Sequence, residues 1–159
     1  MTANCDHDHP QTGLGGPKLD AALRAAESRC AEAQQRLTAP RRRVLELLLE
    51  QGHAVKAYDL IAAFGRDGAP AKPPTVYRAL DFLERQGFAH RIESLNAYVA
   101  CRQGPDSHAA AFLICDCCGD TREVEPVGAD RLRELAGRSG YTVKVVTLEA
   151  HGLCAACAA

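Results

Sequence analysis

Two Cys-x-x-Cys pairs near the C-terminal end constrain this chain more than any other feature of its sequence. They are Cys115/Cys118 and Cys154/Cys157. A Cys-x-x-Cys turn places both sulfurs on one side of the backbone, and two such turns close a cage of four thiolates, which is a ligand set of structural zinc. The long gap between the pairs is no obstacle if both turns lie at the same edge of one sheet. The sequence therefore predicts a tetrahedral zinc site.

The remaining cysteines and the redox environment decide how these pairs are interpreted. Eight cysteines in a reducing cytoplasm favour metal thiolates over disulfides. A thioredoxin-like dithiol would need a strand–Cys-x-x-Cys–helix context, which is missing, and it would not need two pairs. Cys117 lies inside the first turn and is expected to point outward, although it could replace a neighbouring ligand. The group of Cys5, His7 and His9 could bind metal weakly, but in a mobile tail such a cluster is more often incidental.

Length and hydropathy limit the chain to one ordinary domain or two small ones. It has 159 residues, 47% of them hydrophobic, and a formal net charge of -1. The longest apolar runs, near 45–49 and 109–114, are too short for a transmembrane helix. The N-terminus is acidic and lacks an apolar signal core, so we expect a cytoplasmic protein.

The N-terminal half has the pattern of a winged helix-turn-helix. Residues 1–17 are rich in Gly, Pro and polar groups and predict a disordered tail. Beyond the tail, helical patterns and capping signals are followed by two alternating runs that suggest a hairpin. The expected helices cover 18–36, 38–52, 57–64 and 72–87, and the expected strands cover 88–94 and 97–101. In such a domain the helix before the hairpin would enter the major groove of DNA.

Charge supports contact with nucleic acid through this half. Residues 36–91 carry ten Lys and Arg against six Asp and Glu, a difference of +4, whereas the whole chain carries -1. Positive charge is therefore concentrated where phosphates would lie. A solvated helical surface would show the same excess, so charge alone does not exclude that alternative.

The C-terminal half predicts a small α/β domain behind a linker. Residues 102–108 form the hinge, and residues 109–159 form the second domain. Strands are expected over 109–114, 121–125 and 141–148, and a helix over 130–139. The predicted fold class is therefore α+β, with a winged-helix domain over 18–101 and an α/β domain after it.

Four further metal-binding side chains fall around the junction of the two halves: His90, Cys101, His108 and Glu123. Imidazole, thiolate and carboxylate are all zinc ligands. None of their spacings is diagnostic, and a lone His or Cys is more often structural than ligating. A metal bound by this quartet would nevertheless tie the DNA-reading half to the second domain.

Three segments of the sequence carry a family resemblance. The segment Lys72-Pro-Pro-Thr-Val-Tyr-Arg-Ala-Leu-Asp-Phe-Leu, followed by Gly-Phe-Ala-His, resembles the recognition-helix signature of the ferric uptake regulator superfamily. Ile114-Cys-Asp-Cys-Cys-Gly and Glu149-Ala-His-Gly-Leu-Cys-Ala-Ala-Cys are similar to its C-terminal metal pairs. The resemblance covers roughly residues 20–157 and looks closest to the zinc uptake regulator branch.

The resemblance assigns roles to the quartet and to the DNA-binding half. Sensor sites of the zinc branch use two His, one Cys and one Glu, which fall on His90, Cys101, His108 and Glu123. A thiolate among imidazoles also suits zinc better than Fe(II) or Mn(II). For DNA, the resemblance points to Arg78 and Tyr58. Thr75 and Tyr77 are placed for phosphate contacts near the helix start, and Lys72 and Arg91 add charge; Tyr58 and Tyr77 could instead be packed against the neighbouring helix.

The resulting expectation is a homodimeric, zinc-responsive repressor. It would hold two Zn²⁺ per chain, one structural and one regulatory, and bind palindromic operator DNA that controls zinc-uptake genes. An iron, manganese or peroxide sensor of the same superfamily is the alternative, and it would make Cys101 dispensable. A zinc enzyme would need an open coordination position and a general base, and the His-x-Glu deaminase signature is absent. Neither catalysis, a small-molecule substrate nor a membrane partner is expected.

Overall fold

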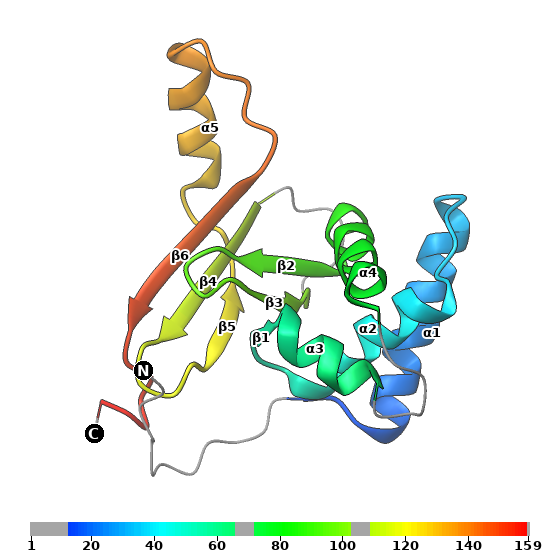
Figure 1. Ribbon diagram of the computed structural model, residues 1–159. Helices are drawn as coiled ribbons and strands as arrows, with labels where there is room; N and C mark the ends of the chain where they lie inside the picture. The colour runs from blue at the N-terminus through cyan, green and yellow to red at the C-terminus, as the bar shows by residue number, and fades with distance from the viewer. Residues whose placement is uncertain (1–12, 66–71, 103–108, 159) are drawn as a thin grey trace. The chain divides into compact units, whose positions relative to one another are not determined.

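The computed structural model describes residues 13–65, 72–102 and 109–158 (Figure 1). The chain divides into two compact units, one ending at Cys101 and the other beginning at Arg102. The mixed content of helices and small sheets confirms the predicted α+β class.

Four helices form the bulk of the first unit. They are α1 (Gly16–Glu32), α2 (Ala39–Gln51), α3 (Ala57–Phe64) and α4 (Pro73–Arg85). Proline stands in the first turn of α1, α2 and α4, where its missing N–H costs nothing. Gly52 ends α2 in the left-handed conformation at φ 67°, as the sequence predicted. Thr38 occupies the N-cap position of α2, but its side chain makes no capping hydrogen bond.

The N-terminal boundary differs from the prediction. Helix α1 begins at Gly16, inside the expected tail of residues 1–17, and it ends at Glu32, four residues before Arg36. The backbone N–H of Leu14 donates to the carbonyl of Leu49 over 2.8 Å, and the Leu14 side chain packs against the core. This apolar anchor accounts for the order just before α1. Residues 1–12, including the Cys5, His7 and His9 group, lie outside the described residues.

A three-stranded sheet completes the first unit. Strands β2 (Ala89–Ile92) and β3 (Ala97–Ala100) form the predicted hairpin, and β1 (Val55–Lys56) adds to β3, so the order is β1-β3-β2. The sequence did not predict β1, because a two-residue strand is too short to show alternation. The helices and this wing share one core, whose fully buried members include Leu23, Leu48, Leu60, Leu80 and Leu83. The unit is a winged helix-turn-helix.

The second unit is built on a sheet of β4 (Ala109–Cys115), β5 (Thr121–Val124) and β6 (Val146–Gly152), with α5 (Ala129–Arg138) between β5 and β6. The order is β5-β4-β6, antiparallel between β4 and β5 and parallel between β4 and β6. The predicted last strand, 141–148, was placed too early. Pairing begins at Val146, opposite Ala109, because register against β4 rather than β-branched content decides where this strand starts.

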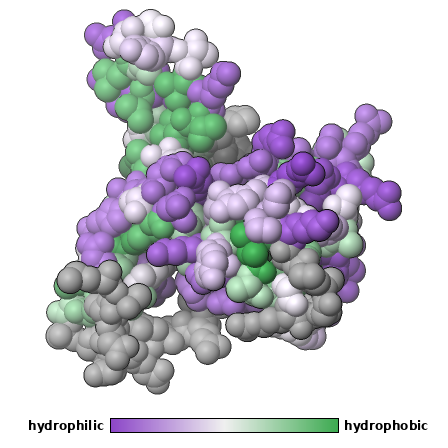
Figure 2. All heavy atoms as spheres, in the orientation of Figure 1, coloured by the Kyte–Doolittle hydropathy of each residue, from purple (hydrophilic) through white to green (hydrophobic). Residues whose placement is uncertain are grey.

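Helix α5 stands beyond the end of this sheet (Figure 1). Ala129, its first residue, joins the small core with Ala109 and Val146. Leu132 and Leu135 remain exposed on the helix, and Figure 2 shows apolar atoms gathered over it as a green patch. Helix α5 therefore buries little of its apolar side within its own unit. Among the described residues, no helix is long and apolar enough to span a bilayer.

Candidate metal centres and nucleic-acid interface

Parallel pairing of β4 and β6 brings the two Cys-x-x-Cys turns together. In this register Cys115 lies opposite Gly152, so both strands end at the same edge of the sheet. The chain turns through Cys118 directly after β4 and through Cys154 and Cys157 shortly after β6. Residues far apart in sequence therefore share one edge, which is the arrangement that the prediction of a single site required.

The four sulfurs fit a zinc ion by distance and chemistry. The ligand atoms of Cys115, Cys118, Cys154 and Cys157 all lie within 4.8 Å of one another. The Sγ atoms of Cys118 and Cys154 are 3.8 Å apart. Four sulfurs at the usual Zn–S distance of about 2.3 Å in a tetrahedron would be separated by about 3.8 Å. Cys117 is half-buried in the same turn and is not among the four.

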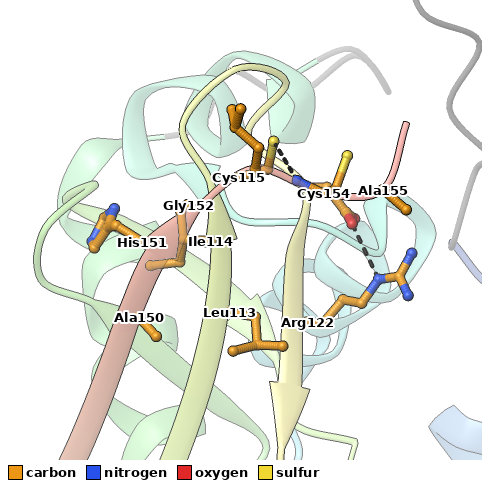
Figure 3. Close-up of a pocket in the computed structure, with 11 residues that line it drawn as sticks. Leu113, Ile114, Cys115, Arg122, Ala150, His151, Gly152, Cys154 and Ala155 are labelled. Carbon is orange, nitrogen blue, oxygen red and sulfur yellow. Dashed lines mark hydrogen bonds and ion pairs between the residues drawn. The ribbon is translucent and has the colours of Figure 1, made fainter. Parts of the chain in front are cut away.

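Backbone hydrogen bonds stabilise the thiolate form of one cysteine of this cage, Cys115. Backbone N–H groups, that of Cys118 first and that of Cys154 second, lower the pKa of the Cys115 thiol to about 6. Figure 3 shows the Cys154 N–H directed at the Cys115 sulfur, over 3.3 Å. Burial raises the pKa of Cys118 and of Cys157. Four crowded thiolates need a cation to balance them, and a divalent metal supplies that charge.

The surroundings of the cage hold a residue pair that sequence reasoning missed. His151 of β6 places Nδ1 2.9 Å from Oδ1 of Asp116, and the N–H of Asp116 donates to the carbonyl of Gly152 over 2.8 Å. The pair joins the turn after β4 to the last strand. A pocket of about 370 Å³ opens beside it, lined in part by Leu113, Arg122 and Cys154 (Figure 3). No sequence signal distinguishes Asp116 from any other polar turn residue.

Two members of the predicted quartet lie side by side in the winged-helix unit. His90 on β2 pairs with Val99, and the N–H of Cys101 donates to the carbonyl of Phe88 over 2.9 Å. This register puts His90 and Cys101 on the same face of the hairpin as diagonal neighbours. Their ligand atoms lie within 4.8 Å of each other, and both residues are half-buried.

The other two members belong to the region after Cys101. Glu123 lies on β5 opposite Phe112, and its carboxylate accepts a hydrogen bond of 2.7 Å from the N–H of Arg102. It is half-buried, which suits a ligand more than a solvated surface carboxylate. His108 falls outside the described residues. Its assignment to the sensor site therefore stays a prediction.

The candidate DNA-binding residues lie on α3 and α4. Tyr58, on the first turn of α3, is 78% exposed, and Tyr77 is 47% exposed, so the alternative of burial is wrong for Tyr58. Lys72, the N-cap residue of α4, and Arg78, in its second turn, are also exposed. Thr75, in the first turn, is half-buried. The structure thus leaves the side chains of Tyr58, Lys72, Tyr77 and Arg78 accessible to solvent.

Three consecutive arginines at the start of α2 make contacts with side chains of their own unit. The Arg41 guanidinium stacks 3.6 Å from the centroid of Phe82. Arg42 pairs with Glu27 at 3.0 Å, and Arg43 pairs with Glu46 at 2.9 Å. The charge excess of residues 36–91 therefore overstates the positive surface available to phosphates. A count of charged residues in the sequence does not distinguish arginines that pair within the protein from arginines that are available to phosphates.

Comparison with known proteins agrees with this geometry. The model of the ferric uptake regulator family matches residues 32–151, which include most of the winged helix and the first Cys pair, Cys115/Cys118, but not the second pair. The chain belongs to the ferric uptake regulator family. A Helicobacter pylori ferric uptake regulator structure, at 17% identity and a TM-score of 0.54, shares the family fold.

Among the similar proteins of the family are zinc uptake regulators. The zinc uptake regulation protein of Escherichia coli (strain K12) is 46% identical over 137 residues, covering 85% of this chain and 80% of that protein. A zinc uptake regulator solved with zinc and DNA is 44% identical with a TM-score of 0.84, covering 90% of this chain and 97% of that one. Holo XcZur is 44% identical with a TM-score of 0.79, covering 87% and 98%.

Proposed function

We propose that this ferric uptake regulator family member is a zinc-responsive transcriptional repressor. Zinc-loaded, it binds palindromic operator DNA as a homodimer and represses genes for zinc uptake. The observation that carries the proposal is the pairing of a thiolate with an imidazole on the wing, Cys101 beside His90, in a chain that also has a separate four-cysteine cage. Such a mixed S/N site selects zinc over Fe(II) and Mn(II), which would favour nitrogen and oxygen ligands.

The two metal sites divide structural and regulatory roles. In the four-cysteine cage all four coordination positions of the zinc would be filled by protein. Zinc bound there would therefore have a structural role and stabilise the edge of the β5-β4-β6 sheet. The regulatory zinc is bound by His90, Cys101, His108 and Glu123. These ligands come from both sides of the boundary at Cys101, so zinc binding would fix the two units in one arrangement. That accounts for two zinc ions per chain.

Side chains of α3 and α4 read the DNA. Arg78 offers a planar guanidinium that can bond both acceptors of a guanine edge, and Tyr58, Thr75, Tyr77 and Lys72 bind the backbone. Dimerisation uses the apolar surface of the second unit, around α5. The proposal assigns no catalysis, because both metal sites have complete protein ligand sets.

A variant of the sensor site tests the proposal. Replacing His108 by Ala should leave a folded dimer with about one zinc per chain that no longer gains operator affinity when zinc is added. The measurement is operator binding against buffered free zinc, with metal content determined on the same sample. Cys115→Ser is the contrasting variant, since loss of the cage should reduce folding and dimerisation instead. If His108→Ala still responds to zinc like the wild type, the sensor assignment is wrong.

A further inference from the structure

The recognition helix is held at its C-terminal end by two arginines from other helices. Arg29, in the last turn of α1, donates from Nη2 to the carbonyl of Gln86 over 3.3 Å. Its guanidinium also lies 4.2 Å from the centroid of Phe88. Gln86 is the C-cap of α4, and Phe88 follows it by two residues. The Arg29 side chain thus contacts both the C-terminal end of α4 and the segment that leads into β2.

Arg41 acts on the same end from α2. Its guanidinium stacks on Phe82, one turn before the C-cap, and its Nη1 donates to the carbonyl of Arg36 over 2.6 Å. Phe82 and Phe88 are 5% and 6% exposed, so both cations lie over largely desolvated rings. Cation–π contacts of this kind are stronger than exposed ones. A positive charge near a helix C-terminus also complements the helix dipole.

We infer that Arg29 and Arg41 are positioning residues for DNA reading: they fix the axis of α4 and thereby the place of Arg78. This inference rests on the proposed function. The reading residues stand near the N-terminal end of α4, and Arg78 precedes Gln86 by roughly 12 Å of helix at 1.5 Å per residue. A tilt of about 5° at the C-cap would displace Arg78 by about 1 Å, more than the roughly 0.5 Å that a preorganised site tolerates.

The inference also gives α1 a role. Helix α1 buries Leu19, Leu23, Ala26 and Cys30 in the core, so Arg29 projects from a fixed base. Lysine could not replace this arginine, since an ammonium neither stacks flat on a ring nor keeps the guanidinium's fork geometry. A phosphate contact, in contrast, would tolerate lysine. That difference separates positioning from direct contact with DNA.

The test compares Arg29→Met, Arg29→Lys and the control Arg24→Met, which changes an exposed arginine of the same helix. The probe is a duplex enriched from a random-sequence library by zinc-loaded wild-type protein, and an unrelated duplex measures non-specific affinity. Both Arg29 variants should lose specific affinity by about 3- to 30-fold, the range for a partly buried cation–π contact. Non-specific affinity, zinc content and the salt slope should stay at wild-type values, as should all properties of Arg24→Met.

Three outcomes would overturn the inference. Equal losses on both duplexes with a salt slope reduced by about one would make Arg29 a phosphate contact. Full affinity in Arg29→Lys with a loss in Arg29→Met would likewise indicate a direct phosphate contact, and losses in both variants no larger than in Arg24→Met would leave Arg29 a purely structural residue. Should Arg29→Met not fold, Arg29→Lys and Arg41→Lys are compared instead, with the same readouts. Failure of the wild type to enrich any duplex would refute the proposed function rather than this inference.

Discussion

At the scale of single residues, the arginines of the first unit differ in what they contact. Arg41, Arg42 and Arg43 contact groups of their own unit, whereas Arg78 is exposed on α4. Since a bidentate contact to guanine discriminates by about 1–3 kcal/mol, Arg78→Ala should weaken operator binding by about 5- to 150-fold. Non-specific binding should change much less. Competition between operator and unrelated duplexes measures the ratio, and equal losses would make Arg78 a phosphate contact.

The cage cysteines were predictable from sequence because chemistry and spacing coincide at one short motif. The structure brings Cys115, Cys118, Cys154 and Cys157 together as one cluster of possible ligands. Asp116 and His151 were not predictable as a pair, because their contact depends on the register of β4 against β6. Arg41 was counted only as charge and Arg29 was not singled out, since nothing in the sequence shows that an arginine will stack on a distant ring.

At the scale of elements, α5 contributes few buried side chains to the second unit. Leu132 and Leu135 are 46% and 44% exposed, and Val127 just before the helix is 81% exposed. If this surface forms the dimer, Leu132→Lys should weaken dimerisation by about 10-fold or more, since burying a leucine contributes roughly 1.5–3 kcal/mol.

A matched variant on the same helix controls for the added charge. Glu134 pairs with Arg131 on α5 and is itself exposed. Glu134→Lys should leave dimerisation near the wild-type value, because an exposed pair contributes little. Sedimentation at a series of protein concentrations measures both. Equal dissociation in the two variants, or in neither, would place the dimer interface elsewhere.

The bounds of helices and strands could be predicted from the sequence pattern in some places and not in others. Helix α3 was predicted at its observed bounds, 57–64, because apolar spacing and the following glycine agree. The strand expected over 141–148 is instead β6, Val146–Gly152. Tyr141 and Val145, which made the segment look like a strand, are exposed. Their β-propensity has no bearing on pairing when the neighbouring strand begins only at Ala109, opposite Val146.

At the scale of the whole molecule, the proposal is a coupling between two ligands. If zinc at His90, Cys101, His108 and Glu123 favours the DNA-binding arrangement, operator DNA must tighten zinc binding by the same factor. The four-cysteine cage contributes to stability but not to this coupling, because its zinc would be retained in both states. Selectivity for zinc would then reside in Cys101, the only thiolate of the proposed sensor site.

The most direct measurement is operator affinity against buffered free Zn²⁺, Fe²⁺ and Mn²⁺, with metal content determined per chain in each sample. The account predicts that affinity rises at least about 10-fold as content passes from one to two zinc per chain, a typical allosteric coupling. Fe²⁺ and Mn²⁺ should give no comparable rise at buffered concentrations that load the chain. Equal or greater activation by Fe²⁺ or Mn²⁺, or operator binding that is independent of the second zinc, would contradict the account.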